Sequence, residues 1–152
     1  MWQRKQTLFL LIAGVLVALL YWVPALTLTI PTDTTHAYIL DATGVHTAQD
    51  YSALSVLSVA LSGIIVLLTL VVLCLFKKRK LQARMTLFTL LLVIALLGVM
   101  VFNAISFINT KGAVMTLSWG GILFPASILF YYLAIRGIVA DEILVRSVDR
   151  LR

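Results

Sequence analysis

Charged side chains are scarce in this sequence: they make up 12% of its 152 residues, against about a quarter in an ordinary soluble domain. Hydrophobic residues make up 62%, and the mean hydropathy is +1.08. A soluble chain of this size could not bury so much apolar surface, because much of a small domain still faces water. The composition therefore excludes a soluble globular domain and a disordered chain, and predicts an integral membrane protein.

Cysteine and histidine are almost absent. Cys74 is the single cysteine, which excludes an intramolecular disulfide and a multi-cysteine metal site. A metal site outside the membrane would have to draw on His36, His46, Asp33, Asp41 and Asp50. These residues lie in one polar segment without a compact ligand spacing, so we expect solvated loop residues and no bound metal.

Charged residues are missing from four long stretches, each with 24 to 27 uncharged residues. A helix of about 20 residues crosses the hydrocarbon core, so each stretch fits one crossing. The expected spans are residues 7–23, 53–76, 86–108 and 115–135. Continuous apolar runs favour helices over barrel strands. We therefore predict one all-α membrane domain over residues 1–152, an up-down-up-down bundle of four transmembrane helices.

The basic residues are distributed unequally between the two sides of this predicted bundle. If both termini are cytoplasmic, 11 of the 12 basic residues lie inside and only Lys111 lies outside. This asymmetry follows the positive-inside rule. The net charge of +6 then needs no nucleic-acid partner, because anionic headgroups at the cytoplasmic face account for it. The expected lipid or partner contacts on this side are Arg4, Lys77, Lys78, Arg79, Lys80 and Arg84.

The first apolar run has a second interpretation, as a secretory signal peptide after Arg4 and Lys5. The run of about 17 residues is longer than the usual apolar region of a signal peptide. The sequence Val23-Pro24-Ala25 is also a poor cleavage site. An uncleaved first span is therefore the favoured interpretation.

Apart from the first six residues and the short outside turn Asn109–Ala113, three segments lie outside the predicted spans. The extracytoplasmic loop, 24–52, alternates apolar residues and threonine over Leu26–Ile30, which predicts a small β-hairpin with Ala37–Leu40. A short cytoplasmic loop covers 77–85. The tail, 137–152, places Leu144, Val148 and Leu151 on one stripe and Glu142 four residues before Arg146. We expect an amphipathic cytoplasmic helix that either extends the fourth span or lies along the headgroups.

Small and polar residues within the spans predict close helix contacts. Ser55, Ser58, Ser62 and Thr69 form one stripe, and Gly14 and Ala18 form a small-residue pair. The full set of expected packing positions is Gly14, Ala18, Ser55, Ser58, Ser62, Gly98, Asn103, Gly121 and Pro125. Pro125 is expected to kink the fourth span. The alternative is a pore or solute site built from Asn103, Ser106 and the Gly120–Pro125 interruption.

The two ends of the chain and the basic loop carry a family resemblance. Met1–Thr7, Lys77–Arg84 and Asp141–Arg152 resemble a family of small four-pass bacterial inner-membrane proteins of unknown function, common among the Bacteroidota. The resemblance covers nearly the whole chain and implies a bacterial inner-membrane location, with no assigned activity. It also draws attention to Gln3, Arg4, Asp141, Glu142, Arg146, Asp149 and Arg150.

Two functions follow from these observations. The absence of Asp, Glu, Lys, Arg and His from the spans argues against an ion pump, and no nucleophile–base pair indicates an enzyme or a cofactor. The favoured hypothesis is a non-enzymatic scaffold or accessory subunit that binds a membrane-protein partner or a second copy. Leu144, Val148 and Leu151 would anchor the partner, with Arg146 and Arg150 setting the register. The alternative is a small transporter or channel for a neutral or lipid-like solute.

Overall fold

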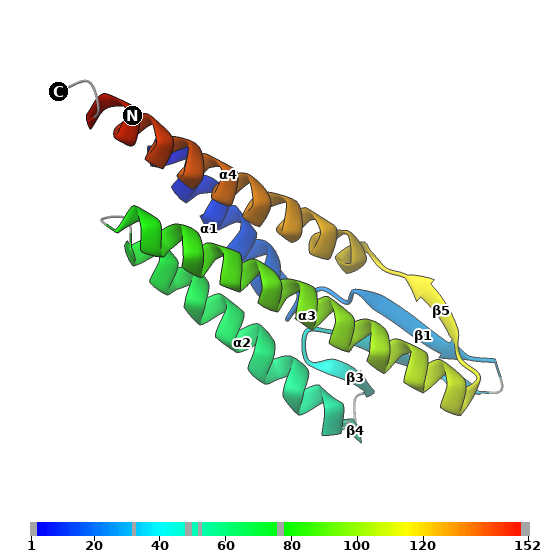
Figure 1. Cartoon of the computed structure of the whole chain (residues 1–152). Helices are drawn as coiled ribbons and strands as arrows, with labels where there is room; N and C mark the ends of the chain where they lie inside the picture. Colours follow the sequence, from blue (N-terminus) through cyan, green and yellow to red (C-terminus); the bar gives the residue numbers. More distant parts are fainter. Residues whose placement is uncertain (1–2, 32, 48–49, 52, 76–77, 150–152) are drawn as a thin grey trace.

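The computed structural model describes residues 3–31, 33–47, 50–51, 53–75 and 78–149. Within these ranges, the side chains of 3–6, 33–37, 47, 50–51, 53–55, 79, 142 and 144–149 lie outside the description. Four long helices form the body, and a small antiparallel sheet lies at one end of them (Figure 1). The helices are α1 (Gln3–Leu19), α2 (Ala53–Cys74), α3 (Arg79–Lys111) and α4 (Leu123–Asp149).

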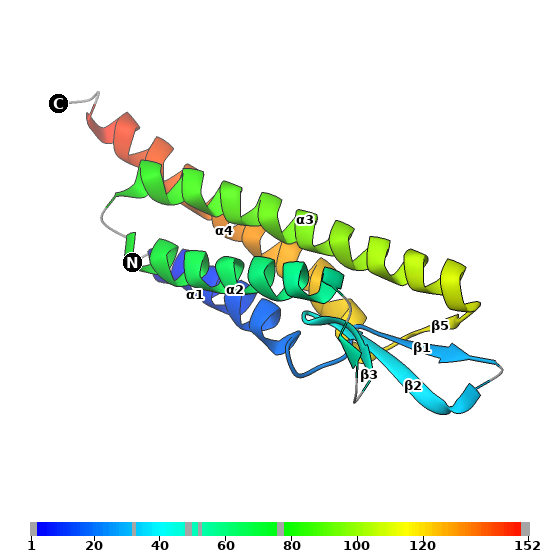
Figure 2. The same cartoon turned by 90° about the horizontal axis from the view of Figure 1, so that it is seen from below.

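Consecutive helices run in opposite directions along the bundle. Both ends of the chain lie at the same end, opposite the sheet, in the two views (Figures 1 and 2). α1 packs against α2 and α4, and α3 packs against α2 and α4. Three helical segments are long and apolar enough to cross a membrane, namely Val56–Cys74, Lys80–Lys111 and Trp119–Asp141. Thr7–Leu19 is a shorter apolar helix.

The sheet has five antiparallel strands in the order β4-β3-β2-β1-β5. Its strands are β1 (Leu26–Ile30), β2 (Asp33–Asp41), β3 (Gly44–Thr47), β4 (Asp50–Tyr51) and β5 (Val114–Leu117). The predicted hairpin is present, with Leu26 opposite Leu40 and Leu28 opposite Tyr38. The sheet is larger than predicted, because β5 pairs with β1 across a long sequence separation.

The alternation in β1 divides the sheet into two faces. Leu28 and Ile30 are buried on one face, and the ring of Tyr38 on the neighbouring strand packs, tilted by 52°, against Phe107 of α3 with centroids 4.7 Å apart. On the other face, the hydroxyls of Thr27 and Thr116 share a hydrogen bond between β1 and β5. The apolar face of the sheet therefore covers the end of the helices.

Backbone hydrogen bonds join the sheet to the end of α1. The amide of Ala42, in the turn after β2, donates to Leu20 O (3.0 Å), and Ala25 N donates to Leu40 O (2.8 Å). At the other connection, α3 ends at Lys111 and is capped by Gly112, whose φ of 63° is left-handed and whose amide donates to Ile108 O (2.8 Å). Glycine adopts this conformation without a Cβ clash, so the chain turns directly into β5.

Three predicted boundaries differ from the observed elements. α1 ends at Leu19, before the expected end of the first span. α3 begins at Arg79, so most of the expected loop 77–85 is helical. Residues 115–117, expected in the fourth span, belong to β5, and a 3-10 turn, η2 (Trp119–Ile122), precedes α4. These differences share a cause. The predicted bounds follow the uncharged stretches of the sequence, and the first and last residues of a helix need not coincide with the ends of such stretches.

The tail prediction had left two arrangements open, and the structure has the first. α4 continues without interruption to Asp149 and projects beyond the α2–α3 connection in both views (Figures 1 and 2). The continuation is consistent with helix-favouring residues over Ala140–Arg146 and with the lack of Gly and Pro there.

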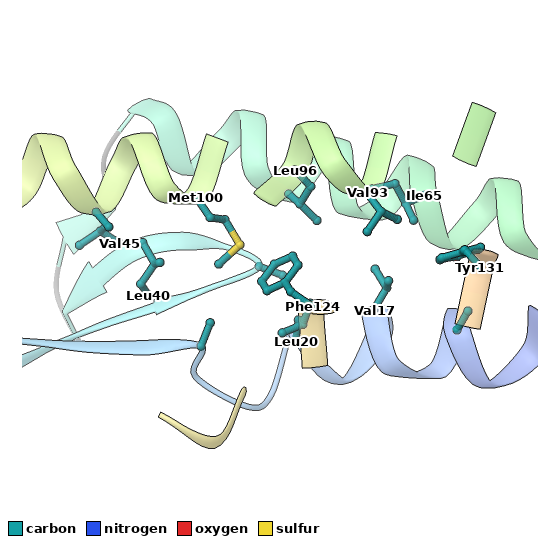
Figure 3. Close-up of a cluster of buried hydrophobic side chains, with 14 of the residues drawn as sticks. Val17, Leu20, Leu40, Val45, Ile65, Val93, Leu96, Met100, Phe124 and Tyr131 are labelled. Atoms are coloured by element: carbon teal, nitrogen blue, oxygen red, sulfur yellow. The ribbon is translucent and has the colours of Figure 1, made fainter. Parts of the chain in front are cut away.

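Side chains from all four helices and from the sheet meet in one buried cluster (Figure 3). The labelled members include Leu20, Leu40, Ile65, Met100 and Phe124. The opposite faces of the helices are also apolar, with Leu11, Leu67, Leu91 and Leu129 more than half exposed. Helices that are apolar all round are typical of lipid surroundings, because water would not tolerate the outer faces.

Candidate functional site: a hydrogen-bonded polar network between the helices

α2 places three hydroxyl side chains on its buried face: Ser58, Ser62 and Thr69. Two of them donate to their own helix, Ser62 Oγ to Ser58 O (2.8 Å) and Thr69 Oγ1 to Ile65 O (2.7 Å). Such back-bonding satisfies the donor within the helix and leaves oxygen lone pairs for a second helix. The buried stripe on α2 is therefore ready to accept hydrogen bonds from its neighbours.

The part of the stripe near the sheet contacts α3 and the turn after α1. The hydroxyls of Tyr21 and Ser62 share a 2.6 Å hydrogen bond, and Tyr21 OH also lies 3.2 Å from Val59 O. Asn103 of α3 donates from Nδ2 to Ser58 Oγ at 3.4 Å, which is a long bond. We call Tyr21, Ser58, Ser62 and Asn103 the outer polar group.

The remaining member of the stripe contacts α4 and α1. Thr69 Oγ1 and Tyr131 OH share a 2.6 Å hydrogen bond, and Tyr131 has no exposed surface. On the other side of Thr69 lies Gly14, where an added Cβ would come within 2.8 Å of Thr69 Cγ2. Gly14, Thr69 and Tyr131 therefore hold three helices at close approach.

A further polar contact joins α2 and α3 near the ends of the chain. Gln82 is buried and donates from Nε2 to Val72 O at 3.2 Å. One and two turns further along α3, Thr86 and Thr89 are buried and donate to the carbonyls of Gln82 and Met85. Sequence reasoning missed Gln82 because it placed this residue in a loop, and no spacing signal marked it.

The chemistry of this network is that of helix association. Every partner named above is a hydroxyl, an amide or a backbone carbonyl. Hydrogen bonds of this kind between membrane helices contribute on the order of 0.6 kcal/mol each. The network supplies position and specificity to the packing of the helices.

A second polar cluster lies in the β2–β3 turn. Asp41 Oδ1 accepts hydrogen bonds from both Thr43 N (2.7 Å) and Thr43 Oγ1, which is the pattern of an Asx turn. His46 Nε2 lies 3.6 Å from Asp41 Oδ2, and His46 Nδ1 lies 3.2 Å from Thr43 Oγ1. His46 therefore lies in β3, opposite Ile39 of β2, with its ring beside the turn, whereas the sequence indicated a solvated loop residue. Among the described residues, no group of three or more His, Cys, Asp or Glu is arranged to hold a metal ion.

Several predicted packing residues do not lie between helices. Gly98 is exposed on α3, and apart from its own stretch of helix no atom of the described residues lies within 4 Å of an added Cβ. Pro125 lies in the first turn of α4, where a missing amide hydrogen breaks no helical bond, so it does not kink a span. Gly121 lies in η2, where an added Cβ would be 3.0 Å from Ala25 O. Ala18 is half-buried on α1.

The residues of the predicted pore or solute site are not brought together. Asn103 is buried, whereas Ser106 is exposed. The Gly120–Pro125 segment forms η2 and the start of α4, so it does not interrupt a helix midway. A break near the midplane was the main reason for expecting a solute site there.

The predicted lipid and partner contacts divide into three sets. Lys78, Lys80 and Arg84 are exposed at the α2–α3 connection. Outside the described residues lie Lys77, Arg150 and Leu151. Helical backbone is described, but the side chains are not, for Arg4, Arg79, Glu142, Leu144, Arg146 and Val148, and the same holds for Ser55 in the packing set.

The fold and the network define a helical protein whose apolar helices are held by uncharged hydrogen bonds, with three helices suited to a membrane. The chain belongs to the family described as Domain of unknown function (DUF4293), whose model matches residues 2–151. The predicted membership of a family of unknown function is thereby confirmed. A comparison with curated proteins gives no match.

Proposed function

We propose that the protein crosses the bacterial inner membrane four times, with both termini cytoplasmic and the sheet outside. α1 is the critical helix, because its 17 residues are shorter than a usual span. Both faces of α1 carry apolar side chains: Leu10 and Val17 are buried, and Leu11 and Val15 are exposed. A helix held in the bundle on one side and apolar on the other is suited to lipid. The turn Leu20–Pro24 would complete the crossing.

The ends of the bundle carry the charges and aromatic rings that this orientation requires. Lys78, Lys80, Arg84 and Arg136 are exposed away from the sheet. At the sheet end, Trp22 and Trp119 are 78% and 85% exposed. Tryptophan is enriched at membrane–water interfaces, and clustered cations favour the cytoplasmic side. Both distributions support the proposed sidedness.

Cysteine labelling tests this topology. In a Cys74→Ala background, Gln3→Cys, Lys80→Cys and Thr116→Cys place one thiol at the start of α1, at the α2–α3 end and on β5. We expect a membrane-impermeant maleimide to label Thr116→Cys in intact cells and the other two only after permeabilisation. Labelling of Gln3→Cys together with Thr116→Cys in intact cells would show that α1 does not cross.

We further propose a non-enzymatic role, as a scaffold or accessory subunit whose cytoplasmic α4 extension binds a membrane-protein partner or a second copy. The observation that carries this proposal is the uninterrupted course of α4 to Asp149, beyond the α2–α3 connection (Figure 1). On that helix, Leu144, Val148 and Leu151 fall on one stripe of the sequence. The separation of Asn103, Ser106 and Gly120–Pro125 leaves the transport alternative with less support.

Site-specific photo-crosslinking tests the scaffold proposal. A photoreactive phenylalanine at Val148 should give a discrete adduct with a partner or a second copy, and Leu144→Arg should abolish it, because a charge on the stripe disrupts apolar docking. Asp149→Asn is the matched control off the stripe and should leave the adduct unchanged. An adduct that survives Leu144→Arg, or no adduct at Val148 in native membranes, would contradict the proposal.

A further inference from the structure

One buried polar atom in the outer polar group stands out. Asn103 is 3% exposed, and its Oδ1 is the buried side-chain oxygen that lacks a hydrogen-bond partner among the described residues. An unpaired buried acceptor costs about 1–3 kcal/mol, so native proteins satisfy nearly all such groups. The atom therefore requires an explanation.

Turning the side-chain amide over does not remove the problem. In the present orientation Nδ2 donates to Ser58 Oγ at 3.4 Å and Oδ1 has no partner. In the reverse orientation Oδ1 would face Ser58, and the two donors of the amide would occupy the unpartnered position. Either way, one end of the amide is left to a group that the described residues do not supply.

The surroundings define what that group is. Asn103 contacts α2 at Ser58, which lies on the same helix face as Ser62. Ser62 in turn is hydrogen-bonded to Tyr21, a half-buried residue in the turn between α1 and β1. The named neighbours are hydroxyls and carbonyls without a formal charge. An ion would lose its hydration there without a counter-charge, which is costly, whereas a neutral hydroxyl fits with two or more hydrogen bonds.

We propose that Asn103 is a binding site for a neutral hydroxyl donor, held between α2 and α3 by the Asn103 amide and the hydroxyls of the outer polar group. The donor is either a water molecule or the hydroxyl of a small polyol that enters from the sheet end. This assignment is independent of the scaffold proposal, because it concerns the bundle interior and not the α4 extension.

Selective labelling tests the site in the intact protein, because Asn103 and Asn109 are the only asparagines. In water-edited solid-state NMR of asparagine-labelled protein in bilayers, we expect magnetisation to be transferred from water to the side chains of both Asn103 and Asn109. Asn109 is exposed and serves as the hydrated reference. Transfer to Asn103 on the same order as to Asn109, despite its burial, is the expected result for bound water.

A second experiment, the effect of glycerol on the melting temperature, distinguishes a bound polyol from bound water. If the natural donor is a polyol, glycerol should raise the melting temperature of the wild type and of Asn109→Leu by the same amount, and should not do so for Asn103→Leu. If it is water, glycerol should affect all three proteins equally, and the transfer to Asn103 should remain. The proposal is overturned if Asn103 receives no water magnetisation and glycerol has no Asn103-dependent effect.

Discussion

Replacing Gly120 with alanine should destabilise the protein by about 3 kcal/mol, the upper end of the usual cost of overpacking. Gly120 is buried, and its amide donates to Pro24 O at 3.1 Å. An added Cβ would lie 2.4 Å from Pro24 O, 2.7 Å from Pro24 C and 2.8 Å from Val23 O. All three are backbone atoms, so no side-chain rotation relieves the clash.

The clash also affects the sheet, because the same stretch of backbone holds β1 and β5. Ala25 N donates to Leu40 O, and Ser118 N donates to Ala25 O (3.2 Å). Moving Pro24 away from the new methyl group would strain both bonds. Gly120→Ala should therefore lower the melting temperature in detergent and raise the protease sensitivity of the sheet.

Gly98→Ala is the matched control for this experiment. It makes the same chemical change in α3, where the described parts of the chain beyond that stretch of helix place no atom within 4 Å of the new Cβ. Alanine is favoured over glycine in a helix by up to about 1 kcal/mol, so this variant should be neutral or slightly stabilising. Equal melting temperatures for the two variants would contradict the close approach of Gly120 to Pro24.

The sequence predicted the helical class and the first hairpin because both depend on local patterns. Uncharged runs identify apolar helices, and the Leu–Thr alternation of Leu26–Ile30 has the period of a half-buried strand. β5 has no such signal. Its four residues, Val114–Leu117, are not distinguishable in the sequence from the apolar run of the fourth predicted span that follows them. Its partner strand, β1, lies far away in the sequence.

Helix ends were harder to predict, since charge and helix formation are separate properties. Lysine and arginine are good helix formers, so α3 begins within the basic segment, at Arg79. Conversely, Trp119–Ile122 is apolar but forms a 3-10 turn, because Gly120 and Gly121 pack closely against the chain around Pro24 and Ala25. That contact depends on tertiary structure and could not be predicted locally.

The polar network was half predictable. The stripe of Ser58, Ser62 and Thr69 on α2 follows from helical spacing, but its partners depend on how the helices are rotated and offset. Tyr21 and Tyr131 lie near the ends of their predicted spans, at the level where tyrosine is enriched beside the lipid headgroups. Tyr131 is instead fully buried against Thr69. The sequence pattern identifies which face carries hydroxyls, and packing decides which tyrosine meets them.

Tyr131→Ala should be strongly destabilising, by about 3 kcal/mol or more, the range for removing a buried aromatic ring. Tyr131 has no exposed surface, whereas Tyr132 is 54% exposed, so Tyr132→Ala is the matched control and should cost little. Tyr131→Phe isolates the hydroxyl: Thr69 Oγ1 keeps its bond to Ile65 O, so we expect a loss on the order of 0.6 kcal/mol.

Unfolding in mixed micelles, followed by tyrosine and tryptophan fluorescence, measures all three variants. In lipid the surroundings of the helices are as apolar as the core, so the large loss in Tyr131→Ala must come from dispersion contacts that the cavity removes. We therefore expect Tyr131→Ala to be much less stable than Tyr131→Phe, and Tyr132→Ala to be about as stable as the wild type. If Tyr131→Phe lost as much as Tyr131→Ala, the hydroxyl contact with Thr69, and not ring packing, would hold α2 and α4 together.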